Sequence, residues 1–127
     1  MTVKNANRQS PSVAMAVITA AALADGLKQA VVELPGGAIV TGGFVTVTKA
    51  FDSSDAATLK LGDATVDNRY GAPDMKSTGL TALTLTGFVT PVEGDIEFTY
   101  TGSVPTEGEA HLVLEYIVVN RAEFTQG

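Results

Sequence analysis

Gly108-Glu-Ala-His-Leu-Val-Leu-Glu-Tyr-Ile-Val-Val-Asn120 is the segment around which the chain is organised. In an extended strand side chains alternate between the two faces. One face would therefore carry Leu112, Leu114, Tyr116 and Val118. The other would carry His111, Val113, Glu115, Ile117 and Val119, so it is half apolar too. Two apolar faces are typical of a central strand whose second face is covered by another sheet, an arm or a neighbouring subunit.

This second apolar face indicates assembly. Val113, Ile117 and Val119 would form a hydrophobic stripe in water unless another surface covers it, and such stripes are usually interfaces on soluble proteins. We therefore predict that these three residues contact a partner. The alternative is that the second sheet of the same chain covers them and that the even-numbered face is the outer one.

Length and composition fit one domain. The chain has 127 residues, of which 45% are hydrophobic and 17% charged, and this is enough apolar material for one core. We expect a domain over residues 13–120, an N-terminal arm over 1–12 and a C-terminal tail over 121–127. The absence of cysteine excludes disulfides and thiolate metal sites. The net charge of −6 argues against nucleic-acid binding, which needs clustered lysine and arginine.

The N-terminus begins like a signal peptide, with an apolar run over residues 13–23. No clear cleavage site follows, and the run is too short to span a bilayer, so we expect neither secretion nor membrane binding. Residues 1–12 are polar and are either a frayed tail or an arm that becomes ordered on a partner. In the second case Lys4 and Arg8 would be interface residues, together with Phe124 in the tail.

The hydrophobic pattern predicts about eight short strands and no long helix. Strands are expected over 13–19, 27–34, 39–50, 58–61, 80–86 and 95–101, besides the organising segment. Gly42-Gly43 suggests a bulge or a bend within the third of these. The region 66–75 is the least regular. This spacing is typical of an antiparallel β-sandwich, and eight strands suit a jelly roll.

Residues 19–26 are expected to form one helical turn. Thr19 would cap its start and Gly26 would adopt a left-handed conformation at its end. The alternative is one alanine-rich helix over 12–24, which the β-branched residues in that stretch weaken. In the sandwich we expect Leu83 and Leu85 to lie in register. The centre of the core is predicted to consist of Ile96, Phe98, Leu112, Leu114 and Tyr116.

Candidate catalytic and metal sites are weak. His111 is the only histidine, so no two-histidine metal centre is possible, and an exposed or interfacial position suits it better than catalysis. Four carboxylates lie near one another in the sequence, namely Asp52, Asp55, Asp63 and Asp67. Their spacing does not match that of a calcium-binding loop, so we interpret them as turn caps. The sequence Asp67-Asn68-Arg69-Tyr70 is either a polar loop or a buried Asp67–Arg69 pair under the tyrosine. We expect no cofactor, no metal and no enzymatic activity.

Three stretches together resemble a known family: residues 34–43 (Leu-Pro-Gly-Gly-Ala-Ile-Val-Thr-Gly-Gly), residues 50–53 with 61–63, and 114–127. The chain is similar there to capsid decoration (cement) proteins of tailed bacteriophages, which have a jelly-roll fold. The resemblance implies a structural protein made in the bacterial cytoplasm that binds the outer capsid surface. It also implies contacts that bridge major capsid protein subunits and stabilise the shell, and a homo-oligomer, dimer or trimer.

Three other functions remain open at this point. A different virion component, such as a tail or head-fibre base domain, would also be β-rich and acidic. A carbohydrate-binding jelly roll would need exposed aromatic side chains, but the chain has no tryptophan and is only 6% aromatic. A cupin-type enzyme would need several histidines.

Overall fold

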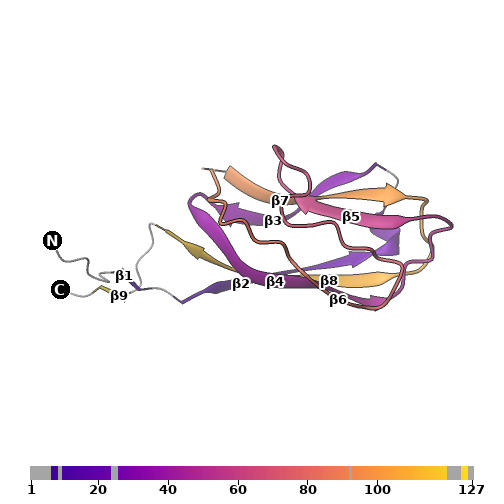
Figure 1. Cartoon of the computed structure of the whole chain (residues 1–127), viewed down its shortest axis with the longest axis horizontal. Helices are drawn as coiled ribbons and strands as arrows, with labels where there is room; N and C mark the ends of the chain where they lie inside the picture. Colours follow the sequence, from indigo (N-terminus) through magenta and orange to yellow (C-terminus); the bar gives the residue numbers. More distant parts are fainter. Residues whose placement is uncertain (1–6, 9, 24–25, 92, 120–123, 126–127) are drawn as a thin grey trace.

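The computed structural model is a sandwich of two antiparallel sheets that lie one above the other (Figure 1). It describes residues 7–8, 10–23, 26–91, 93–119 and 124–125. The elements are β1 (Asn7–Arg8), β2 (Ser12–Thr19), the 3₁₀ turn η1 (Ala20–Ala22), β3 (Lys28–Pro35), β4 (Ala38–Lys49), β5 (Ala57–Gly62), β6 (Gly79–Ala82), β7 (Glu93–Gly102), β8 (Glu109–Val118) and β9 (Phe124–Thr125).

The strand order is that of a jelly roll. One sheet has four strands in the order β2-β8-β4-β6, and the other has three in the order β3-β7-β5. From β2 to β8, each connection along the chain crosses from one sheet to the other. This alternation nests two Greek keys, so the predicted sandwich of jelly-roll type is confirmed. The organising segment is β8, and its predicted central position is also confirmed, because it lies between β2 and β4.

An irregular segment takes the eighth strand position. The residues the structure describes give seven strands in the two sheets, against about eight expected. Residues 70–75 run along the outer edge of β5, where Gly71 pairs with Leu61 and Asp74 with Thr58 as isolated antiparallel bridges. Pro73 has no N–H and accepts one bond from the Leu59 amide at 3.1 Å. The segment therefore covers the β5 edge without forming a regular ladder.

The core lies between the sheets and agrees closely with the predicted set. Four of the five predicted residues are at most 2% exposed, namely Ile96, Phe98, Leu112 and Leu114. Tyr116 is only partly buried and packs against this cluster, because it lies near the end of β8. Leu59, Leu61 and Tyr100 complete the centre from the three-stranded sheet. The two sheets thus meet through the even-numbered face of β8.

The strand expected over 13–19 is confirmed: residues 12–19 form β2 and not part of the alternative helix, because β8 offers them a full ladder. Two other local expectations were wrong. Thr19 does not cap η1 with its side chain, although Gly26 has the expected positive φ of 76°. The strand predicted over 80–86 ends at Ala82: the Leu83 amide still bonds to Gly43 of β4, but the next amide, that of Thr84, bonds to Tyr70 outside β4. Leu85 is consequently 46% exposed and is not in the core.

The glycine-rich turns have the geometry that the sequence suggested. The register of β4 on β8 shifts between Val40 and Gly42, which is the predicted bulge. Gly37 has φ of 80°, and the turn after β3 is held by Thr90. The Thr90 hydroxyl donates to the Pro35 carbonyl at 2.6 Å and accepts from the Ala38 amide at 2.9 Å. One buried threonine therefore satisfies both sides of this turn.

The two ends of the chain pair with each other. In β1 and β9 Asn7 lies opposite Thr125 and Arg8 opposite Phe124, in antiparallel register. This ribbon lies beyond the end of the sandwich, on the left in Figure 1. Like the ribbon, the β2–β8 pair joins an N-terminal to a C-terminal segment in antiparallel register, with Ser12 opposite Tyr116. The two terminal segments thus leave the domain together.

Candidate interaction surface

The outer side of the four-stranded sheet is mainly apolar. The registers place Met15, Val113, Phe44 and Ala82 in one row across β2, β8, β4 and β6. The next row contains Val17, His111, Thr46 and Leu80. Ile117 lies opposite Ile39 further along β8. We call this surface the apolar outer face and define it by Val13, Met15, Val17, Ile39, Phe44, Leu80, Val113 and Ile117.

Several of these side chains are strongly exposed. Val13, Met15 and Val17 on β2 are 58%, 66% and 56% exposed, and Leu80 on β6 is 64% exposed. Phe44, Val113 and Ile117 are half-buried by their neighbours. Single exposed apolar residues are normal, but a contiguous group on one sheet face is characteristic of an interaction site. This group extends over β2, β8 and β4 and reaches β6.

The register decides which side of β8 faces outward. The even-numbered Ala110, Leu112 and Leu114 are buried, so Val113 and Ile117 lie on the outer side, as in the first of the two interpretations of the sequence. Val119, just beyond β8, is 43% exposed. Arg8 and Phe124 lie opposite each other in the β1–β9 ribbon, and Lys4 lies outside the described residues. Whether these six residues contact a partner stays a prediction.

The sequence did not identify the contribution of β2. Val13, Met15 and Val17 share a face by simple alternation, and this was visible in the sequence. Which side that face takes depends on pairing with β8, which is about a hundred residues away in the chain. The signal that could have identified the site was the match of two strands that are both apolar at odd positions.

Few charges interrupt the apolar outer face. Glu115 is exposed beside Val13, and His111 is half-buried next to Val17. The His111 Nε2 atom is 3.8 Å from the Glu109 carboxylate at the start of β8. His111 thus lies on the outer surface of the sheet, beside the apolar residues of β2.

The aspartates act as loop caps. The Asp52 carboxylate accepts hydrogen bonds from the Thr106 hydroxyl, the Thr106 amide at 2.7 Å and the Glu107 amide at 2.9 Å. These donors, led by the Thr106 hydroxyl, lower the pKa of Asp52 from 3.8 to about 2. Asp55 accepts from the Ser103 amide at 2.8 Å, and this bond lowers its pKa. Both residues tie the β4–β5 connection to the β7–β8 connection.

Of the two alternatives left open for residues 67–70, the Asp67–Arg69 pair is wrong. Arg69 pairs with Asp63 at 2.5 Å, and its guanidinium lies 3.5 Å from the centre of the Phe88 ring. Asp67 instead contacts Lys60 at 3.5 Å. The reason is the turn after β5, in which Asp63 accepts from the amides of Thr65 and Val66 and so faces Arg69. Burial raises the pKa of Asp63, but the bonds from Arg69, Val66 and Thr65 lower it more.

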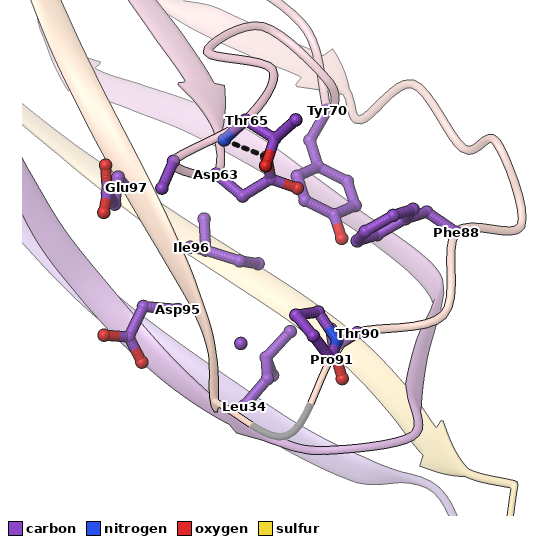
Figure 2. A pocket seen from close by; sticks show the side chains of 12 residues that line it. Leu34, Asp63, Thr65, Tyr70, Phe88, Thr90, Pro91, Asp95, Ile96 and Glu97 are labelled. Carbon is purple, nitrogen blue, oxygen red and sulfur yellow. Dashed lines mark hydrogen bonds between the residues drawn. The ribbon is translucent and has the colours of Figure 1, made fainter.

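A small pocket of about 170 Å³ adjoins this ion pair (Figure 2). Figure 2 shows Ile96 and Leu34 at its floor, the Tyr70 and Phe88 rings on one side, and Asp95 and Glu97 at the other. Three of the polar groups around it have protein partners: Asp63 binds Arg69, Glu97 binds Lys28 at 3.3 Å, and Thr90 bonds the turn after β3. These groups serve the fold, and the apolar outer face is the better candidate site.

The described residues hold no group of three or more histidine, cysteine, aspartate or glutamate side chains that could bind a metal ion. They also contain no helix of the length and hydropathy needed to cross a membrane.

The comparison with known proteins gives fold matches only. No family model matches the sequence, and no curated protein matches it. The structure is similar to a chain in the "acidic stable capsid structure" of Helicobacter pylori bacteriophage KHP30, with a TM-score of 0.67 and 14% identity. That match covers 85% of this chain and 87% of the other.

Two further capsid structures contain chains of the same fold. One is the capsid asymmetric unit of cyanophage Pam1, with a TM-score of 0.65 and 16% identity over 93% of this chain and 90% of the other. The other is the capsid of Ralstonia phage GP4, with a TM-score of 0.67 and 16% identity over 94% and 91%. The chain therefore has a fold that occurs in phage capsids, in agreement with the resemblance found in the sequence.

Proposed function

We propose that this protein is a structural component of a tailed-phage virion that binds the outside of the capsid and stabilises it. It bridges neighbouring subunits of the major capsid protein, as a decoration or cement protein does. The proposal also includes its assembly as a homo-oligomer and its synthesis in the bacterial cytoplasm. The observation that carries it is the apolar outer face on a fold shared with chains of three phage capsids.

The chemistry of the surface supports a binding role. Exposed valine, methionine and leucine side chains gain free energy when another protein covers them, at about 25 cal/mol per Å² of apolar area. The polar groups of the loops are engaged within the chain, as the Asp52 and Asp63 caps show. The exposed apolar side chains of the four-stranded sheet, in contrast, are available for contact with another protein.

The paired chain ends support bridging. The β1–β9 ribbon lies beyond the sandwich, so it can reach a neighbour that the sheet does not touch. A protein with a contact face and a projecting ribbon can hold two subunits of a shell at once. Arg8 and Phe124 lie opposite each other in this ribbon.

The test is binding to capsids that lack this protein, followed by sedimentation and imaging. The wild-type chain should co-sediment and occupy regular lattice positions on the outer surface. Ile117→Asp should stay folded by circular dichroism but lose binding, because it places a charge where the contact excludes water. Val104→Asp is the matched control: Val104 is 62% exposed in the β7–β8 loop, outside the apolar outer face, and this variant should bind normally.

Two results would count against the proposal. If wild-type protein does not bind capsids but assembles into rods or rings by itself, a tail component is the better explanation. If Ile117→Asp and Val104→Asp both bind like wild type, the apolar outer face is not the capsid contact.

A further inference from the structure

The sandwich has four sheet edges, and three of them are protected. β3 has a bulge between Ala30 and Val32, carries Lys28 and Glu33, and ends in Pro35. The β5 edge is covered by the segment 70–75. β6 has only four residues. Bulges, charges, prolines, cover and short length are the devices that prevent edge strands from pairing with other chains.

The fourth edge, β2, has none of these devices. It is eight residues long, and its register with β8 runs without a bulge from Ser12 to Thr19. It contains no charged residue and no proline. In the described part of the chain β8 is the only strand in its sheet that is hydrogen-bonded to β2, so the other edge of residues 13–18 has no neighbouring strand. A long, regular, apolar edge is a template for pairing with another strand.

We propose that β2 pairs with β2 of a second copy of this chain, antiparallel across a two-fold axis, to form a dimer. The two four-stranded sheets would then join into one sheet. The proposal deepens the homo-oligomer part of the proposed function, but it depends on the fold and not on capsid binding.

Charge restricts where a second copy can bind, and the β2 edge is such a place. Each chain has a net charge of −6, so two copies repel each other at most surfaces. The segment Ser12–Thr19 is neutral, and its exposed side chains are the valines and methionine that lose water when β2 becomes an internal strand. Identical strands in antiparallel order also satisfy a two-fold axis, the commonest symmetry of soluble dimers.

The faces of the sheet restrict the register. Odd-numbered residues of β2 point outward and even-numbered residues point toward the core, as Ile18 at 2% exposed shows. In the joined sheet odd residues must lie opposite odd residues, because a slip of one would turn one sheet over. Met15 therefore lies opposite Met15, Val13 or Val17 of the second copy. The apolar outer faces of both copies become continuous.

The test measures the mass of the purified full-length chain in solution. Wild type should have the mass of two chains and Met15→Lys that of one, with an unchanged circular dichroism spectrum. Met15 is 66% exposed on the outer side, so lysine is compatible with the fold while it places two like charges together at the paired edge. Leu80→Lys is the matched control on the opposite edge, where the residue is 64% exposed, and it should remain a dimer.

Disulfide trapping identifies the edge directly, since the chain has no cysteine of its own. Single cysteines at Val13, Met15 and Val17, alone and mixed pairwise, should give one self-pair or mixed pair that crosslinks rapidly under mild oxidation. Leu80→Cys should not crosslink at that rate. A wild-type monomer, a larger closed assembly, a dimer that survives Met15→Lys, or the absence of β2 crosslinks would overturn the proposal.

These outcomes are separable from those of the capsid experiment. Ile117 lies on β8, away from the proposed pairing edge, so Ile117→Asp should lose capsid binding and still be a dimer. If the dimer fails while wild type binds capsids, only the edge pairing is wrong. If the dimer forms without capsid binding, only the proposed function is wrong.

Discussion

The two sheets of this sandwich share one core but have opposite outer surfaces. On the three-stranded sheet the outward residues are polar, and Lys28 and Glu97 form an ion pair across β3 and β7 at 3.3 Å. Asp95 and Thr101 on β7 are also exposed. On the four-stranded sheet the corresponding positions hold Val13, Met15 and Leu80. Since the same backbone architecture supports both, the difference lies in the outward side chains alone, and it is the difference expected if one surface meets water and the other a protein partner.

The largest expected effect tests the part that the two sheets share. Phe98→Ala should lower the free energy of unfolding by about 3–5 kcal/mol, because it empties a site that is 2% exposed. Leu80→Ala, on the apolar outer face, should change it by less than about 0.5 kcal/mol. Denaturant titration of both variants measures this contrast. A loss below about 1 kcal/mol for Phe98→Ala would mean that the register of β7 is wrong.

A moderate effect is expected at the ion pairs on the polar side. Arg69→Met should cost about 1–3 kcal/mol, because it leaves Asp63, 17% exposed, without its partner and removes the contact with Phe88. Lys60→Met is the matched control: its pair with Asp67 is 40% and 45% exposed and should contribute below about 1 kcal/mol. Thermal unfolding of the two variants gives the comparison. Equal losses would show that burial does not determine the strength of these pairs.

The smallest effect concerns pH and the loops that join the sheets. The pKa of Asp52 is about 2 in the folded chain and 3.8 ordinarily, so the ionised carboxylate stabilises the fold. This stabilisation is complete above pH 3.8 and is lost as the pH falls toward about 2. Asp52→Asn should therefore unfold with a flatter pH dependence in that range. Thr106→Val removes only the hydroxyl donor and should flatten it in part; denaturant titrations at several pH values measure both.

Much of the fold could be predicted from local alternation. The pattern at Ile96 and Phe98 and that at Leu112 and Leu114 identified the core, because a strand with one buried face alternates regularly. The two apolar faces of β8 identified the central strand. Both conclusions depend on residues within one strand, where the sequence contains the complete pattern.

The remaining features depend on partners that are distant in the chain. The strand expected over 80–86 is short because Thr84 bonds to Tyr70, a contact that alternation cannot show. A pair of Arg69 with Asp67, its near neighbour in sequence, was one of two alternatives, but the turn after β5 presents Asp63 instead. The apolar outer face required the pairing of β2 with β8. Its residues were visible in the sequence, but their gathering on one surface was not.

The strand order also determines when the fold can be completed. β8 is the last strand of the sandwich to leave the ribosome, and it lies between β2 and β4, which are made much earlier. Until β8 arrives, β2 lacks its neighbour in the sheet and β4 lacks its longest ladder. Such pairing between distant segments is slow, since the loop must close before the contacts form. The four-stranded sheet of the nascent chain is therefore incomplete during most of synthesis. Throughout that time β2, which has no bulge, charge or proline to prevent pairing, has no neighbouring strand on either edge.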